Sequence, residues 1–181
     1  MISNAAGLQV SDRANIVMRV LSAISACGVK RVLMMPENGG IRSFLKRDLQ
    51  RKQQMGDNCF AELEMTNTPI NGTVEDTFAA TKAMVDSGVK TIVVLGGDGT
   101  HRAVAKVCGQ VPIAGISTGT NNAFPEHREP TITGLAVGLA ATGRVPESVA
   151  FTFNKLLCVK INDGERSDIA LVDVVVSTER Y

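Results

Sequence analysis

The apolar residues of this chain alternate between helical spacing and short unbroken runs. From Ser11 or Asp12, either of which can cap a helix, the apolar residues recur at the three- and four-residue intervals of one helix face as far as Gly28. A glycine at that position suits the end of a helix. The unbroken apolar run 31–35 then predicts a short buried strand, and helical spacing returns from Ile41 to Leu49. The chain is therefore predicted to begin with a helix, a strand and a second helix.

The same alternation continues to about residue 142. Residues 59–65 predict a strand, and a helix capped by Thr73 follows it. Two further apolar runs, 91–95 and 112–116, predict buried strands, and a helix is expected over 131–142. The residues expected on the inward face of this last helix are Ile132, Leu135 and Leu139. This order is typical of an α/β fold, an open doubly wound parallel sheet with helices on both faces.

The pattern changes after about residue 150. Two strand-like runs, 155–161 and 168–177, flank an Asp-Gly pair of the kind found in hairpin turns. A stretch with glycine and proline near 144–154 marks the expected boundary. The two expected domains are residues 1–150, an α/β domain, and residues 151–181, the first hairpin of a β-rich domain.

A lone hairpin is marginally stable in water. It must pack on the α/β domain, pair with another chain, or belong to a longer protein. We favour the last alternative, in which this sequence is a fragment or a truncated product. We also expect the isolated chain to form homo-oligomers through its β-rich segment.

Composition narrows the classes of function. The 181 residues carry a net charge of +1 and only 4% aromatic residues without tryptophan, which argues against a nucleic-acid partner. No apolar run reaches about 18 residues, so no membrane span is expected. The four cysteines are scattered, which argues against a zinc site and favours buried free thiols in a reducing, cytoplasmic setting. They are Cys27, Cys59, Cys108 and Cys158.

The strongest chemical signal lies directly after the predicted strand 91–95. It consists of Gly96, Gly97, Asp98, Gly99 and Thr100. Glycines let main-chain N–H groups approach a phosphate and adopt positive φ angles, and a helix N-terminus favours negative charge. A carboxylate beside phosphate can bind Mg²⁺ or accept a proton from an attacking hydroxyl. The alternative is a plain strand-to-helix turn with Thr100 as N-cap, and His101 beside it is expected to be exposed.

A second polar loop follows the next predicted strand. Its candidate binding residues are Thr118, Gly119, Thr120, Asn121 and Asn122. Hydroxyls and amides can bind phosphate, ribose or a base edge, although ordinary turns are rich in the same residues. Because the carboxyl ends of parallel strands meet at one edge of a sheet, the two loops are expected to face the same crevice.

Together, residues 96–100 and 119–122 resemble the superfamily that joins NAD kinases with diacylglycerol and sphingosine-type lipid kinases. The chain is most similar to ATP-NAD kinase-like proteins of bacterial acetoin operons, over about residues 8–181. The segments that carry this likeness are 11–21, 32–36 and 117–125. The resemblance implies a nucleotide-binding α/β domain and phosphoryl transfer, with Mg²⁺, from ATP or polyphosphate. The acceptor would be a hydroxyl of NAD or a related small molecule, in a role linked to acetoin catabolism.

The resemblance also implies roles for single residues. Asp98 would be the catalytic base, the glycines and Thr100 would line the phosphate site, and Asp173 would contact the acceptor. Val172 stands where NAD kinases carry an amide, which favours a lipid or another small hydroxyl compound as the alternative acceptor. A nucleotide-binding module without turnover is the alternative outside the enzymes.

Overall fold

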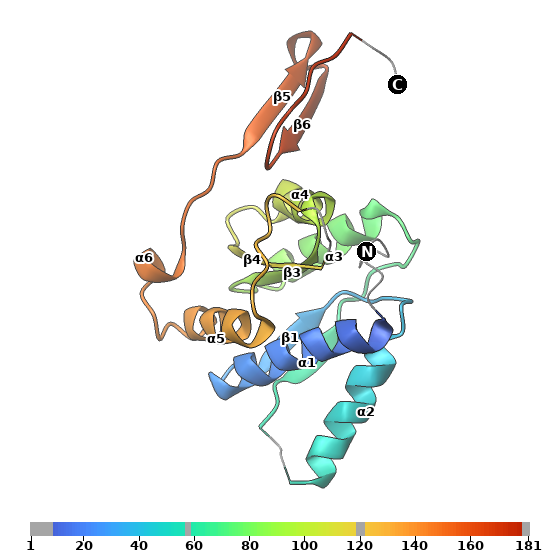
Figure 1. The fold of residues 1–181 in the computed structure, drawn as a ribbon, viewed down its shortest axis with the longest axis vertical. Coiled ribbons are helices and arrows are strands. Elements are labelled where there is room, and N and C mark those ends of the chain that lie inside the picture. Colours follow the sequence, from blue (N-terminus) through green and yellow to red (C-terminus); the bar gives the residue numbers. More distant parts are fainter. Residues whose placement is uncertain (1–8, 57–58, 119–121, 179–181) are drawn as a thin grey trace.

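The computed structural model describes residues 9–56, 59–118 and 122–178. Its helices are α1 (Val10–Ala26), α2 (Ile41–Gln54), α3 (Val74–Asp86), α4 (Asp98–Val107), α5 (Pro130–Ala141) and the short α6 (Glu147–Ala150). Its strands are β1 (Arg31–Met34), β2 (Glu62–Met65), β3 (Ile92–Gly96), β4 (Ile113–Ser117), β5 (Leu157–Ile161) and β6 (Arg166–Ala170). The alternating order predicted from the apolar pattern is confirmed, and Figure 1 shows these elements along the chain.

The strands of the α/β part form two parallel pairs. β1 pairs with β2, and β3 pairs with β4. Among the described residues these pairs are separate two-stranded sheets, because no strand joins β1 to β3. The mixed α/β class is thus confirmed, whereas the single doubly wound sheet and the two-domain division stay predictions.

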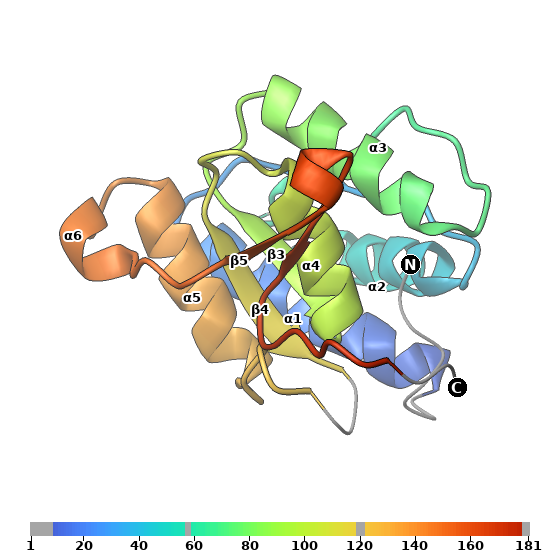
Figure 2. The ribbon, with the colours of Figure 1, turned by 90° about the horizontal axis from the view of Figure 1, so that it is seen from above.

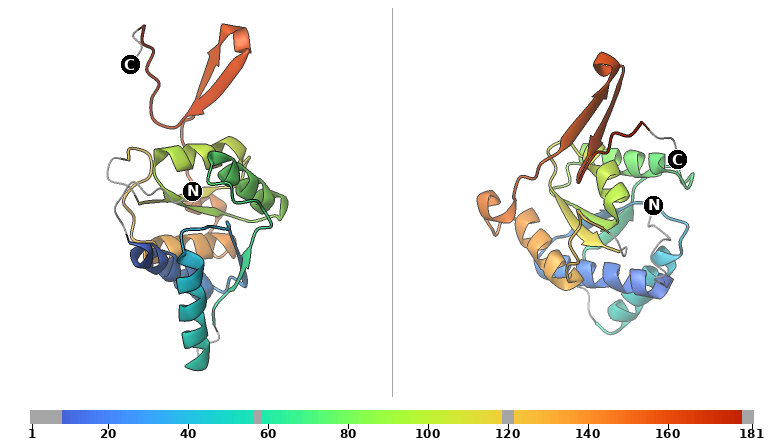
Figure 3. Two further views of the ribbon diagram at one scale, coloured as in Figure 1. Left: turned by 90° about the vertical axis from the view of Figure 1, so that its right-hand side faces the viewer. Right: turned by 45° about the horizontal axis from the view of Figure 1, so that its top comes forward.

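Helices cover the strand pairs from two sides. α3 and α4 lie above β3 and β4, and α1 and α5 lie below them (Figures 1 and 3). α1 packs against both α5 and α2, and α3 packs against α4. On one side of the pair, Ile116 of β4 joins Val20 and Val137, while on the other side Val94 of β3 meets Val104. Burial on both faces explains why these strands are continuous apolar runs.

The inward face predicted for α5 is wrong. Ile132 is 64% exposed and Leu135 is 37% exposed. The helix instead buries Gly134 and Gly138, where an added Cβ would lie 2.8 Å from Cβ of Ala23 and 2.7 Å from Cβ of Cys27, respectively. The small residues let α5 approach α1 closely, and this contact turns the larger side chains outward.

The hairpin β5–β6 confirms the predicted turn but is shorter than expected. Its second strand ends at Ala170, which pairs with Leu157, the first residue of β5. β6 therefore ends at Ala170, and the prediction of a strand over 168–177 is wrong for residues 171–177. Asp173 lies in this exposed, non-strand segment.

The hairpin contacts α4 through Asp168 and through the carbonyl oxygen of Ile169, which accepts from Arg102 Nη1 at 3.2 Å. Asp168 of β6 accepts hydrogen bonds from Arg102 Nη1 at 2.7 Å and from Lys106 Nζ at 3.2 Å, both on α4. Figure 2 shows the hairpin crossing above α4. The Arg102 guanidinium, the N–H of Ile169 and the Lys106 ammonium together hold the pKa of the Asp168 carboxyl well below its usual value.

His101 is completely buried, so the expectation of a solvent-exposed histidine is wrong. Its Nδ1 lies 2.9 Å from the carbonyl oxygen of Gly97, which makes Nδ1 the protonated nitrogen because a carbonyl can only accept. Its Nε2 is buried without a partner among the described residues. The ring packs on β4, where a Cβ at Gly115 would lie 2.6 Å from Nε2. The first turn of α4 therefore points this side chain into the core.

Two of the four cysteines also differ from expectation. Cys27 and Cys108 are buried free thiols, whereas Cys59 and Cys158 are exposed. Cys158 lies on the hairpin, whose thin two-stranded shape cannot bury a side chain on its open face. None of the helices in the described ranges combines the length and the apolar character that a membrane crossing requires.

Asp168→Asn should loosen the hairpin with little change in the melting temperature. Exposed ion pairs contribute little to global stability, so the loss should be confined to local docking. Limited proteolysis of the hairpin should speed up, and high salt should have the same effect on the unaltered protein. Because folding lowers the pKa of Asp168, docking should persist at neutral pH and weaken only below its ordinary value of 3.8. Asp163→Asn, at an exposed turn residue with φ of 53°, is the matched control.

Acidification should destabilise the fold through His101. Burial lowers the pKa of this histidine from its ordinary value of 6.5, so the neutral form is the folded one. The stability it contributes is complete above about pH 6.5 and is lost as the pH falls through that value and below. Denaturant unfolding between about pH 8 and pH 5 measures the slope of the free energy of unfolding against pH.

His101→Asn, which keeps a donor for Gly97, should flatten that slope, although the smaller side chain costs about 2–4 kcal/mol at every pH. His127→Asn, at an exposed loop residue, is the control and should leave the slope unchanged. If the free energy of unfolding changes equally with pH in His101→Asn and in the unaltered protein, another group is responsible for the pH dependence.

Candidate functional site

The two polar loops leave the same edge of the β3–β4 pair. Gly96, the last residue of β3, is in register with Ser117, the last residue of β4. The N–H of Thr118 donates to the carbonyl oxygen of Gly96 at 3.4 Å, which continues the pairing by one residue. The described residues of the two loops therefore lie at the same edge of the strand pair, as expected, while a shared binding crevice stays a prediction.

The three glycines of the first loop serve different purposes. A Cβ at Gly96 would lie 2.7 Å from Cβ of Thr100, and a Cβ at Gly97 would lie 2.5 Å from Oδ1 of Asn122. A Cβ at Gly99 would meet no described atom within 4 Å. None of the three has a positive φ, so that part of the sequence interpretation is wrong. Gly96 and Gly97 are needed for close packing, and Gly99 leaves open space at the start of α4.

Asp98 ties the second loop to the first. Its Oδ2 accepts from the N–H of Ala123 at 3.0 Å, and its Oδ1 accepts from the N–H of Phe124 at 2.9 Å. Sequence analysis missed these two donors, because main-chain N–H groups leave no signature in residue types. The carboxylate therefore has a structural role that the motif alone did not reveal.

Asn122 makes a second link between the loops. Its Nδ2 donates to Oγ of Ser117 at 2.9 Å, and its Oδ1 lies against Gly97. The hydroxyl oxygen of Thr118 is buried without a partner among the described residues. The other candidates of this loop, Gly119, Thr120 and Asn121, lie outside the described residues.

The geometry at the start of α4 suits an anion. Gly97 is the N-cap residue and makes no side-chain cap, and Asp98 is the first residue of the helix rather than a turn residue before it. Thr100 lies inside the helix, so its expected alternative role as N-cap is wrong. The first N–H groups of a helix have no partner within it, and the helix dipole adds positive potential at that end. Gly99 leaves the approach to these groups open.

Neither the expected acceptor residue Asp173 nor a group of metal ligands joins the two loops in the structure. Asp173 is exposed beyond β6, and no hydrogen bond of the described residues joins it to Asp98 or Asn122. Within the described ranges, no three His, Cys, Asp or Glu side chains gather as metal ligands. A divalent cation at this edge would therefore need ligands from the phosphates of a bound nucleotide, with Asp98 as the adjacent protein carboxylate.

Comparison with known proteins identifies the family of the chain. The family model of the ATP-NAD kinase N-terminal domain matches residues 1–145. Acetoin catabolism protein X of Cupriavidus necator is 54% identical to the chain, in a match that covers 100% of the chain and 51% of that protein. The chain thus spans about half the length of the curated relative it matches. No solved structure matches the chain. The resemblance suggested by the two loop motifs is confirmed, and the chain belongs to the ATP-NAD kinase family.

Proposed function

We propose that this edge of the β3–β4 pair binds the phosphates of ATP, or of an inorganic polyphosphate, for transfer to a hydroxyl group. The observation that carries the proposal is the Asp98 carboxylate, which holds the second loop against the first turn of α4. It places an acidic side chain next to a helix N-terminus with an open approach at Gly99. Phosphoryl transfer depends mainly on such positioning and electrostatics.

The donor phosphates would lie on the N–H groups of Gly97 and Gly99, since the N–H of Thr100 already donates to the carbonyl oxygen of Gly97 at 3.0 Å. Helix dipole and open main chain both favour negative charge there. Thr118, whose buried hydroxyl has no described partner, would supply a further donor from the second loop, together with Gly119, Thr120, Asn121 and Asn122. When bound, Mg²⁺ would neutralise charge on the transferred phosphoryl group, held through the phosphate oxygens.

Asp98 would also act on the acceptor. A carboxylate oxygen has more than one lone pair, so each oxygen can hold its N–H donor and still accept from an incoming hydroxyl. The two N–H groups would fix the orientation of the carboxylate for proton acceptance. This dual use requires no movement of the loops.

For the acceptor we propose NAD or a related small hydroxyl compound. The family membership supports this choice, and the name of the Cupriavidus relative supports a link to acetoin catabolism. Asp173 would contact the acceptor, whereas the neighbouring Val172 has no polar side-chain atoms and leaves a lipid-type hydroxyl as the alternative. Four free cysteines fit a reducing, cytoplasmic location, and self-association through the exposed hairpin is part of the same proposal.

A nucleotide-binding module without turnover is the second candidate. The observation that favours it is that both oxygens of Asp98 already serve as acceptors for main-chain donors. Calorimetric binding of ATP and Mg²⁺ by the chain, with no phosphorylated product from NAD, would favour the module over the kinase.

Gly99→Ala should weaken nucleotide binding without lowering the stability of the protein. The added methyl group meets no described atom, and alanine is favoured over glycine inside a helix by about 1 kcal/mol, so the melting temperature should stay level or rise. If phosphate lies against this residue, the methyl group should weaken ATP binding by about tenfold or more. Calorimetry and thermal unfolding on the same samples measure both effects. Unchanged ATP affinity in a folded Gly99→Ala protein would remove the helix N-terminus as the phosphate site.

Asp98→Asn should reduce turnover far more than ATP affinity if Asp98 is the base. The amide can accept from only one of the two N–H donors, which costs about 1–3 kcal/mol of loop stability. Loss of general-base catalysis typically costs a further 10²–10⁴-fold in rate. Two quantities are measured for each variant: the rate of turnover with ATP and NAD, and the affinity for ATP. Asp163→Asn is the control. Equal losses in ATP affinity and turnover would show that Asp98 holds the second loop in place and is not the catalytic base.

A further inference from the structure

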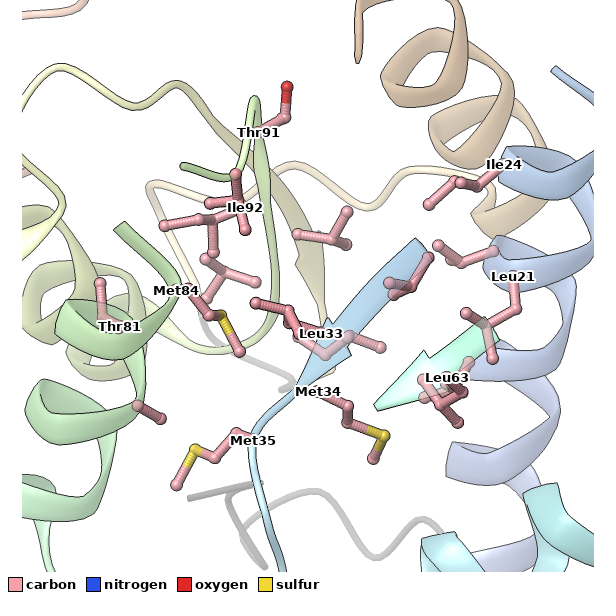
Figure 4. Close-up of a pocket in the computed structure, with 18 of the residues that line it drawn as sticks. Leu21, Ile24, Leu33, Met34, Met35, Leu63, Thr81, Met84, Thr91 and Ile92 are labelled. Atoms are coloured by element: carbon pink, nitrogen blue, oxygen red, sulfur yellow. The ribbon is translucent and has the colours of Figure 1, made fainter. Parts of the chain in front are cut away.

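His101 is a polar side chain in the core, and one of its two ring nitrogens is unpaired. The residue is completely buried, and its Nε2 has no hydrogen-bond partner among the described residues. An apolar side chain of similar size would avoid the cost of burying that atom. The residues of α4 that line the cavity of about 870 Å³ beside β1 and β3 are Thr100 and Val104, so His101 does not open onto that space (Figure 4). What the histidine supplies is therefore found in the contacts that its ring makes.

The first of these contacts is with the N-cap residue of α4. Nδ1–H of His101 donates to the carbonyl oxygen of Gly97 at 2.9 Å. The same oxygen accepts the main-chain N–H groups of Thr100 at 3.0 Å and of His101 at 3.1 Å. Three donors thus converge on one carbonyl oxygen at the start of the helix. Donors that share an acceptor polarise the peptide group to which it belongs.

The peptide group of this carbonyl also contains the N–H of Asp98. The bond is trans and the group is planar, so its N–H points opposite to its C=O. Because the oxygen of Gly97 points into the helix towards His101, the N–H of Asp98 points out of the helix end, where N–H groups have no partner within the helix. Holding the carbonyl therefore fixes the direction of this N–H, and polarising the carbonyl makes it a stronger donor.

The second contact of the ring is with the second loop. The ring centroids of His101 and Phe124 lie 5.8 Å apart, and the ring planes are tilted by 56°. This geometry is typical of favourable aromatic pairs. Phe124 in turn donates its N–H to Oδ1 of Asp98. His101 therefore touches both neighbours of Asp98: Gly97, which shares its peptide group, and Phe124, which binds its carboxylate.

We propose that His101 is a positioning residue of the phosphate site. Its Nδ1–H holds the carbonyl oxygen of Gly97 so that the N–H of Asp98 points at a bound phosphate, beside the N–H groups of Gly97 and Gly99. The imidazole is buried and acts only through the main chain. This inference rests on the proposed function, because it concerns the same helix end.

Two substitutions separate the hydrogen bond from the packing. His101→Leu is close to histidine in size and removes the unpaired Nε2, but leucine cannot donate to Gly97. His101→Asn keeps a donor at the place of Nδ1 but leaves part of the core unfilled. The leucine variant should melt at the higher temperature of the two and yet bind ATP and Mg²⁺ about five- to tenfold more weakly than the unaltered protein, the effect of one lost hydrogen bond. The asparagine variant should stay within about twofold of the unaltered affinity.

Calorimetry and thermal unfolding measure both quantities, and His127→Asn, at an exposed loop residue, is the matched control. The amide resonance of Asp98, recorded without nucleotide, should shift in His101→Leu and stay in place in His101→Asn, because only leucine frees the carbonyl of Gly97. ATP binding by the unaltered protein tests the proposed function separately. If that binding is present, the comparison of the two variants decides on His101 alone.

ATP affinity that falls as far in His101→Asn as in His101→Leu would show that binding follows core packing, and would overturn the inference. So would unaltered ATP affinity in a folded leucine variant. If the leucine variant does not fold, titration of the unaltered protein with ATP and Mg²⁺ decides. The resonances of the His101 Nδ1–H and the Asp98 amide should then move together, and movement of the Asp98 amide alone would overturn the inference.

Discussion

The carboxylate of Asp98 is the contact on which the candidate site depends. It joins two loops by accepting the N–H groups of Ala123 and Phe124, the latter 26 residues further along the chain. Charge-assisted hydrogen bonds are stronger than neutral ones, so one side chain can fix the whole arrangement. Asn122 reinforces it by lying against Gly97, which leaves no room for a side chain there. The open surface that remains is the N-terminal end of α4.

The position of the second loop and the proposed chemistry depend on the same residue, Asp98. Asp98, which we propose acts on a hydroxyl, is also the residue that holds the second loop, so sequence reasoning alone cannot separate the two roles. The same helix turn directs His101 inward, where its protonated Nδ1 bonds to Gly97 and its ring packs on β4. A single turn of α4 thus supplies the acidic side chain, the open N–H groups and a core residue.

The rest of the α/β part positions this turn. β3 and β4 are in register, which brings both loops to one edge. α5 packs closely on α1 through glycines, and Asp168 fastens the hairpin to the exposed side of α4. A cavity of about 870 Å³ is lined by residues of both β1 and β3, which belong to separate strand pairs.

The sequence by itself determined the order of helices and strands, the hairpin turn and the two loop motifs, because apolar periodicity and glycine positions act locally. It also pointed to the family through residues 96–100 and 119–122. Only the tertiary structure decided which face of α5 is buried, that His101 is in the core, and that β6 ends at Ala170. It alone revealed the donors to Asp98. Each of these depends on contacts between segments distant in the chain, and residue type and spacing carry no record of which main-chain groups meet across such distances.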